Sequence, residues 1–252
     1  MTSNPRGDIY RSIRDDTVDL LHRSGATGEE PVPACPGWSV TDLLRHLAGL
    51  AGDWSTAELE VYASVEWTAR HIARYADRDL AELVDAWTAL GDRLADELDR
   101  FDVIERLPAV ITTAAGPAPI DRFPDGILID TLHHHYDLAV ALGASPTHRP
   151  ELERLTKVLV AAAHPQWVAS GHPPAAVNST ESGPIGRLGK GDVVWTVAGD
   201  TFDLFRSLGG RRTLDQVLQR DWSPPSPVPP VRDLVVRFFQ LPPTRVEPGP
   251  RN

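Results

Sequence analysis

The clearest indication of the fold is the segment SVTDLLRHLAGLAGDW, residues 39–54. Ser39 followed by Asp42 is a capping-box-like helix start, and the leucines after it recur at helical spacing. One face of the predicted helix is therefore apolar and has to be buried against other helices. His46 lies on that face, so we expect its imidazole in the interior of a helical bundle.

Helical periodicity extends outward from this segment through the first part of the chain. The other segments that show it are residues 8–23, 79–101 and 123–142, the last ended by Gly143. Four long helices joined by loops predict a bundle domain over residues 1–148. A further helix at 149–163 and a stretch rich in proline and glycine form a predicted helix-and-linker segment, residues 149–174.

The texture of the sequence changes in residues 175–252. Short β-type runs at 175–177 and 193–197 alternate with short helical runs at 201–208, 214–218 and 231–239. We expect a small α+β domain there, which makes the whole protein mainly α.

The composition of the chain excludes several classes of protein. The chain has 252 residues, 41% of them hydrophobic, which suffices for a sizeable core. A net charge of −10 argues against nucleic acid as a partner, and a single cysteine excludes a disulfide framework. The polar N-terminus shows no signal peptide and the apolar runs are too short to span a membrane, so we expect a cytoplasmic protein without a membrane partner.

The segment DTLHHHYD, residues 130–137, carries a pattern suited to a metal ion. Asp130 and His134 are four residues apart and therefore share one helix face. The rest of that face is apolar, where an unpaired carboxylate would be costly to bury and a bound cation would remove the cost. The alternative is a polar helix face with one core imidazole, which we favour for His133 and His135.

A catalytic zinc site typically has three protein ligands and an open fourth position. His46 is the candidate for the third ligand, and the alternative is a core histidine that bonds a backbone carbonyl. Asp53 lies two turns beyond His46 on nearly the same helix face. It could be a competing metal ligand, or a residue that hydrogen-bonds a ligand from behind.

Three ordered segments resemble the mycothiol-dependent maleylpyruvate isomerase family, a group of DinB-like metalloenzymes and thiol transferases. The first is VPACPGWSVTDLLRHLAG, residues 32–49. The second is the Asp-x-x-x-His-x-x-Asp-Leu pattern and the Ala-Leu-Gly that ends it, residues 130–143. The third is residues 199–212, which resemble the family's small C-terminal domain.

The resemblance implies a DinB-like four-helix bundle that holds one divalent metal, zinc or alternatively nickel, with His46, Asp130 and His134 in the ligand positions. The family usually has glutamate where this chain has Asp130. The shorter aspartate would require the helix to lie closer to the metal or the carboxylate to bind through water, and His133 could compensate.

The resemblance also implies that Arg211 and Arg212 contact the thiol cofactor or a substrate carboxylate, although the alternative is solvated surface charge. No catalytic residue beyond the metal site is assigned. Cys35 lies in a proline-rich turn, and we do not expect it to be a nucleophile.

The implied function is a mycothiol-using enzyme that activates the thiol as a metal-bound thiolate and adds it to a small electrophile. The product would be that of an S-transferase or of a cis–trans isomerase of the maleylpyruvate type. Two alternatives remain: a metal-activated hydrolase, and a non-catalytic member of the fold that binds a small molecule or a partner. The sequence leaves open the electrophile and whether the protein is a monomer or a homodimer.

Overall fold

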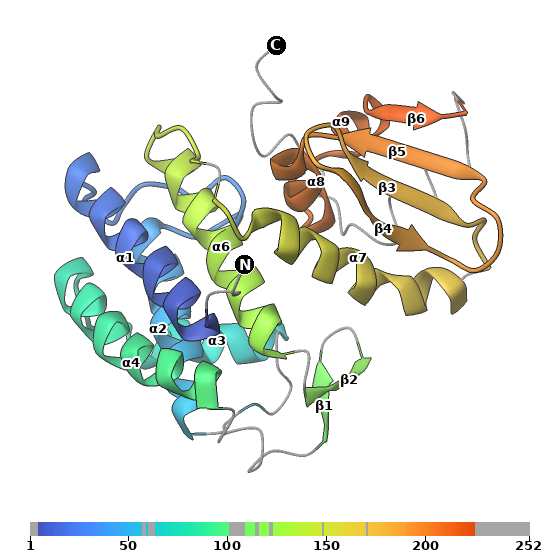
Figure 1. Ribbon diagram of the computed structural model, residues 1–252. Helices are drawn as coiled ribbons and strands as arrows, with labels where there is room; N and C mark the ends of the chain where they lie inside the picture. Colours follow the sequence, from blue (N-terminus) through green and yellow to red (C-terminus); the bar gives the residue numbers. More distant parts are fainter. Residues whose placement is uncertain are drawn as a thin grey trace. The chain divides into compact units, whose positions relative to one another are not determined.

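The computed structural model of the chain describes residues 5–56, 59, 64–100, 109–113, 116–120, 123–147, 149–169 and 171–224. The chain divides into two compact units, Met1–Pro146 and Thr147–Asn252. The first unit is built mainly of helices and the second combines helices with a small sheet (Figure 1). This confirms the predicted mainly α class with a small α+β part at the C-terminal end.

The first unit is organised around four long helices. These are α1 (Arg6–Ser24), α2 (Val40–Thr56), α4 (Leu80–Arg100) and α6 (Phe123–Ala141). Helix α1 contacts α4 and α6, and α2 contacts the same two helices. They are the four helices that the periodicity predicts, with only small shifts at their ends, and Figure 1 shows them side by side.

Helix α2 begins at the predicted capping box. The backbone N–H and the hydroxyl of Ser39 donate to Asp42 Oδ2 over 3.1 and 3.2 Å, and the Asp42 N–H donates to Ser39 Oγ over 3.2 Å. These bonds satisfy donors that a helix start otherwise leaves unpaired. Leu43, Leu44 and Leu47 are fully buried, and each contributes about 1.5–3 kcal/mol by leaving water. The same face carries His46 into the interior of the unit.

Two features of the first unit are absent from the sequence prediction. Helix α3 (Val65–Arg74) is short, starts at Ser64, whose Oγ accepts from the Trp67 N–H over 3.1 Å, and packs against α2. Strands β1 (Val110–Thr113) and β2 (Gly116–Pro119) form an antiparallel hairpin. The prolines of β2 argue against a strand, and α3, with ten residues, is shorter than the four long helices on which the prediction rested.

The second unit is a four-stranded sheet covered by helices. Its elements are α7 (Leu152–Ala169), β3 (Ala175–Ser179), β4 (Gly183–Leu188), β5 (Trp195–Gly199), α8 (Thr201–Leu208), α9 (Leu214–Leu218) and β6 (Asp221–Ser223). The strand order is β4-β3-β5-β6, in which β3 and β5 are parallel and the other pairs are antiparallel. Helix α7 packs against β4 and α8. The predicted helix at 231–239 lies outside the described residues.

Helix α7 continues beyond the point where the sequence indicates a linker. Pro165 lies inside the helix, although an internal proline costs about 3 kcal/mol. Trp167, two residues later, is 2% exposed and its Nε1–H donates to the Pro173 carbonyl over 2.9 Å. The burial of this ring and its hydrogen bond tie the end of the helix to the segment that follows it.

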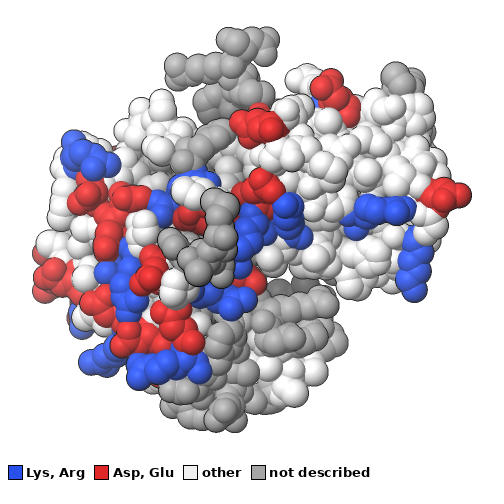
Figure 2. All heavy atoms as spheres, viewed as in Figure 1, with Lys and Arg blue, Asp and Glu red and all other residues white. Residues whose placement is uncertain are grey.

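Charged side chains of both signs alternate over the face that α1 and α4 form (Figure 2). Arg14 Nη1 lies 2.6 Å from Asp92 Oδ1, and Arg11 pairs with Asp8 and Asp96. The Arg14–Asp92 and Arg11–Asp96 pairs link α1 to α4, whereas the Arg11–Asp8 pair lies within α1. Among the described residues, no helix has both the length and the apolar character needed to span a membrane.

Candidate metal centre

The structure brings His46, Asp130 and His134 together inside the first unit. His46 comes from α2 and the other two from α6, and one ligand atom of each lies within 4.8 Å of the others. His46 Nε2 is 3.4 Å from Asp130 Oδ2, and His134 Nε2 is 3.6 Å from Asp130 Oδ1. Both imidazoles are buried, whereas the Asp130 side chain is 34% exposed. The Asp130 side chain is thus partly exposed, although its Oδ2, the oxygen nearest His46, is buried.

These spacings can be compared with those of a zinc site. Zinc takes tetrahedral ligands at roughly 2.0–2.1 Å, which places ligand atoms about 3.3 Å from one another. The separations of 3.4 and 3.6 Å, which involve different oxygens of Asp130, are close to that value, and one ligand atom of each of the three residues lies within 4.8 Å of the others. The shorter aspartate side chain thus reaches both imidazoles, and the residues fit a divalent ion. Two imidazoles and one carboxylate suit zinc and nickel alike.

His134 is oriented by a neighbour on its own helix. Its Nδ1 lies 3.0 Å from Oδ2 of Asp137, which is fully buried. Because a carboxylate accepts the Nδ1–H, the opposite nitrogen, Nε2, faces Asp130. In metal sites, a carboxylate that accepts the N–H of the non-ligating ring nitrogen commonly fixes the orientation of a ligating histidine.

Cys35 lies beside the same histidine. Its Sγ is 3.8 Å from Asp137 Oδ2, and Cys35, His134 and Asp137 form the second group that could hold a metal among the described residues. In that group the Nδ1 of His134 is already bonded to Asp137. Cys35 is therefore a neighbour of the His46–Asp130–His134 cluster rather than a member of it. Its place in a proline-rich turn gave no sign of this proximity.

The two imidazoles of the cluster differ in their affinity for protons. Burial lowers the pKa of His46, and the nearby Asp130 carboxylate only partly opposes it. Burial acts in the same direction on His134, but the Asp130 and Asp137 carboxylates prevail and raise its pKa to about 10. At neutral pH, and without a metal, His134 therefore carries the proton that a cation has to displace.

We expect this proton to make the stability of the metal-free protein depend on pH. Because the folded pKa of His134 is raised from 6.5 to about 10, the stabilisation is fully present below pH 6.5 and is lost as the pH rises through about 10. Metal binding should strengthen over the same range. The measurement is the urea midpoint of chelator-treated protein across this interval. His134→Gln should flatten the curve, and an unchanged curve in that variant would contradict the assignment.

The neighbouring histidines have other partners. His135 Nδ1 lies 2.9 Å from the hydroxyl oxygen of Thr17 on α1, and that hydroxyl donates to the Ile13 carbonyl over 2.7 Å. The His135 N–H is therefore the donor to Thr17. His133 is buried too, and neither it nor His135 belongs to a metal-competent group in the described part of the chain.

Two tryptophan side chains that were not predicted as part of the site lie beside the cluster. The ring centroid of Trp38 is 5.5 Å from that of His46 and 6.4 Å from that of His134. Trp67 on α3 stands edge-on to His46, with the centroids 6.0 Å apart. Trp38 directly precedes the helix start at Ser39, which was the one available signal of its position.

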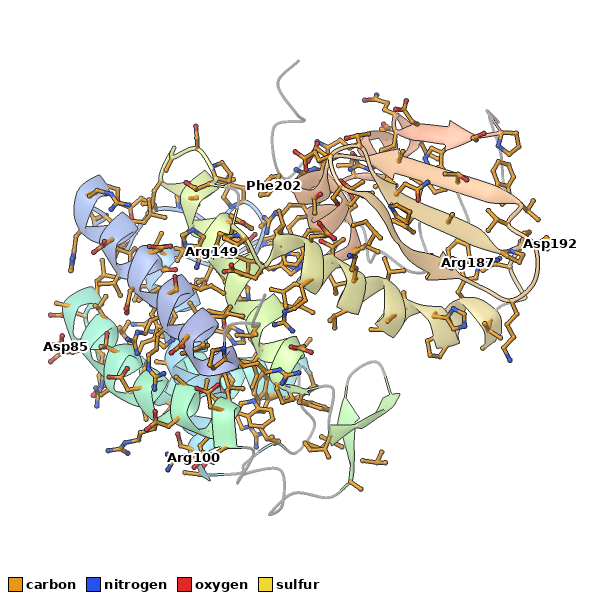
Figure 3. The ribbon with its side chains drawn as sticks, viewed as in Figure 1. Asp85, Arg100, Arg149, Arg187, Asp192 and Phe202 are labelled. Atoms are coloured by element: carbon orange, nitrogen blue, oxygen red, sulfur yellow. The ribbon has the colours of Figure 1, made fainter. Side chains whose placement is uncertain are left out.

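Arg211 and Arg212 lie in the second unit, between α8 and α9. Arg212 is 2% exposed, and its Nε donates to Asp203 Oδ1 over 2.6 Å. Its guanidinium is 5.9 Å from the ring centroid of Phe202, which is labelled in Figure 3. Arg211 Nη1 donates to the Gly209 carbonyl over 2.7 Å. Arg212 is thus built into the core of its unit, and a role of either arginine toward thiol or substrate stays a prediction.

Comparison with known proteins finds one matching family model and two similar solved structures. The model of the mycothiol maleylpyruvate isomerase N-terminal domain matches residues 10–139, a range that includes the whole His46–Asp130–His134 cluster. A crystal structure of the mycothiol-dependent maleylpyruvate isomerase is similar, with a TM-score of 0.55 and 20% identity over 89% of this chain and 93% of that one. A histidine-to-alanine mutant of that enzyme gives a TM-score of 0.54 at the same identity and coverage. No curated protein matches.

Proposed function

Since the chain belongs to the mycothiol maleylpyruvate isomerase N-terminal domain family, we propose that it is a metal-dependent enzyme that uses mycothiol as its thiol cosubstrate. The thiol would add to a small electrophile, which is then either isomerised from cis to trans or released as a conjugate. The observation that carries the proposal is the convergence of His46, Asp130 and His134 at spacings that suit one divalent ion.

The residues of the cluster have separate tasks in this proposal. His46 and His134 would hold a divalent ion through Nε2, and Asp130 through its carboxylate. The chemistry that such an ion supplies is Lewis acidity, which lowers the pKa of a coordinated thiol. Three protein ligands leave a position for that thiol. Asp137 keeps the His134 ring in place, and the rings of Trp38 and Trp67 cover the His46 side of the cluster.

The choice of electrophile follows from the similar structures. The isomerase among them is described as acting on maleylpyruvate, so maleylpyruvate is the first compound to test. The three proposed ligands do not themselves select an electrophile. Isomerase and transferase would share the thiol addition and differ in whether the thiol is eliminated again.

The test is turnover of maleylpyruvate by zinc-loaded protein with mycothiol, with glutathione, and without a thiol. A trans product at constant mycothiol concentration indicates an isomerase, and a mycothiol conjugate indicates a transferase. Conversion that needs the metal but no thiol would contradict the proposal and favour a hydrolase. A fully metal-loaded protein that converts neither maleylpyruvate nor a panel of epoxides and activated alkenes would contradict it as well.

A further inference from the structure

A chain of buried polar groups lies behind His46. The Nδ1 atom of His46 is 3.1 Å from Nδ1 of His71, and His71 Nε2 is 2.9 Å from Asp53 Oδ2. Arg74 Nη1 donates to the other carboxylate oxygen of Asp53 over 2.5 Å. His46, His71 and Asp53 are 5%, 0% and 1% exposed, so their bonds are made with one another rather than with bulk water.

The carboxylate at the far end of this chain sets the direction of its hydrogen bonds. Burial alone would raise the pKa of Asp53, but the hydrogen bonds from His71 and Arg74 hold it below the usual value of 3.8. Asp53 is therefore ionised at neutral pH and can only accept. His71 Nε2 must carry the hydrogen of the bond that it makes with Asp53.

The tautomer of His71 in turn determines the tautomer of His46. A neutral imidazole that donates through Nε2 has only a lone pair at Nδ1. A neutral His71 then accepts the Nδ1–H of His46, which leaves the lone pair of His46 at Nε2. That atom is the one that lies 3.4 Å from Asp130.

The position of His71 is itself tightly fixed. Its ring, from α3, contacts α2 at Gly49, where a Cβ would lie only 2.3 Å from the ring's Cγ. Trp67 packs edge-on against the His71 ring, with the centroids 4.1 Å apart. Glycine at position 49 thus provides the space that lets α3 bring His71 within reach of His46.

We propose that Arg74, Asp53 and His71 form a positioning relay that holds His46 in one orientation and one tautomer, with its Nε2 lone pair toward Asp130. The inference rests on the proposed role of His46 as a metal ligand. His71 and Asp53 are positioning residues, since they act through His46. Asp137 does the corresponding work for His134, so both imidazoles present Nε2 to the same carboxylate.

The first test is the zinc affinity of two variants of His71, measured by competition with a chromophoric chelator. His71→Phe keeps a ring but removes both hydrogen bonds, and should weaken zinc binding by about 10- to 100-fold. In His71→Gln the amide oxygen can accept from His46 while its NH₂ group donates to Asp53. This variant should therefore bind zinc within about threefold of the wild-type affinity, well short of the loss of about 10- to 100-fold expected when the hydrogen bonds are removed.

A second pair of variants tests the relay without altering any of its members. Gly49→Ala should displace the His71 ring and weaken zinc binding as His71→Phe does, even though alanine favours a helix. Gly52→Ala is the matched control on the same helix, because its nearest contact, with Arg74 Nη1 of the relay, would be at an ordinary 3.6 Å that displaces nothing. It should bind zinc like the wild type.

The third test uses the metal-free wild type and needs no variant. Long-range ¹⁵N–¹H spectra should identify His46 as the tautomer protonated at Nδ1. Protonation at Nε2 instead, or unchanged zinc affinity in folded His71→Phe, would overturn the relay. If the wild type has the expected tautomer but binds no zinc, the proposed function fails while the relay stands.

Discussion

Replacing His134 with alanine is expected to lower zinc affinity by more than about 100-fold. Loss of a residue that only hydrogen-bonds a metal ligand typically costs about 10- to 100-fold. The change removes one of the three proposed ligands. It also leaves Asp137, which is fully buried, without the imidazole that it orients. We expect near-stoichiometric zinc in the wild type and almost none in His134→Ala after dialysis against a weak chelator. Metal per chain is measured by mass spectrometry, and affinity by competition titration.

The matched control for this variant is the next residue along α6. His135 is also a buried histidine, but it bonds Thr17 of α1 rather than the cluster. His135→Ala should destabilise the fold and still bind zinc like the wild type. Equal metal loss in both variants would indicate that the effect comes from damaged packing, and equal retention would exclude His134 as a ligand.

The second large effect is expected at Asp130. Asp130→Asn keeps the shape of the side chain and removes the charge, so it should also lower zinc affinity by more than about 100-fold, again more than the loss of a residue that only hydrogen-bonds a metal ligand. Asp130→Glu should retain most of the affinity, with a loss of less than about tenfold, because it keeps a carboxylate on the same face. The added methylene has room, since this side chain is 34% exposed.

The asparagine variant has a second readout that does not involve metal. Asp130 is the strongest of the groups that raise the pKa of His134, so removing its charge should lower that pKa below about 10. NMR titration of the metal-free protein measures it. Tight zinc binding by Asp130→Asn, or an unshifted His134, would show that the carboxylate does not act on the cluster as the geometry indicates.

The helices of the first unit could be predicted because their apolar periods are long and their ends carry local signals. Residues 39–54 hold both a capping box and a buried leucine stripe, and α2 follows them closely. The shared face of Asp130 and His134 also follows from helix geometry alone. That His46 meets them is a tertiary fact, and in the sequence it was implied chiefly by the family resemblance.

The relay that contacts His46 through His71 could not be predicted either, and the reason is different. Periodicity places Asp53 on nearly the same helix face as His46, which left open whether it is a ligand or an outer partner. The structure shows His71 bridging the two side chains, and His71 lies on α3, a ten-residue helix that the sequence analysis did not predict. Gly49 was the available signal, since a glycine inside a helical pattern often marks a close approach.

The most direct test of the central claim, that this cluster binds a metal which in turn binds the thiol of mycothiol, is the absorption spectrum of cobalt(II)-loaded protein titrated with mycothiol. The Cys35→Ser variant is used, so that the thiol 3.8 Å from Asp137 cannot contribute. We predict a thiolate-to-cobalt charge-transfer band that saturates at one mycothiol per metal and is absent with S-methylated mycothiol. A fully cobalt-loaded protein whose spectrum does not change on adding mycothiol would contradict the claim.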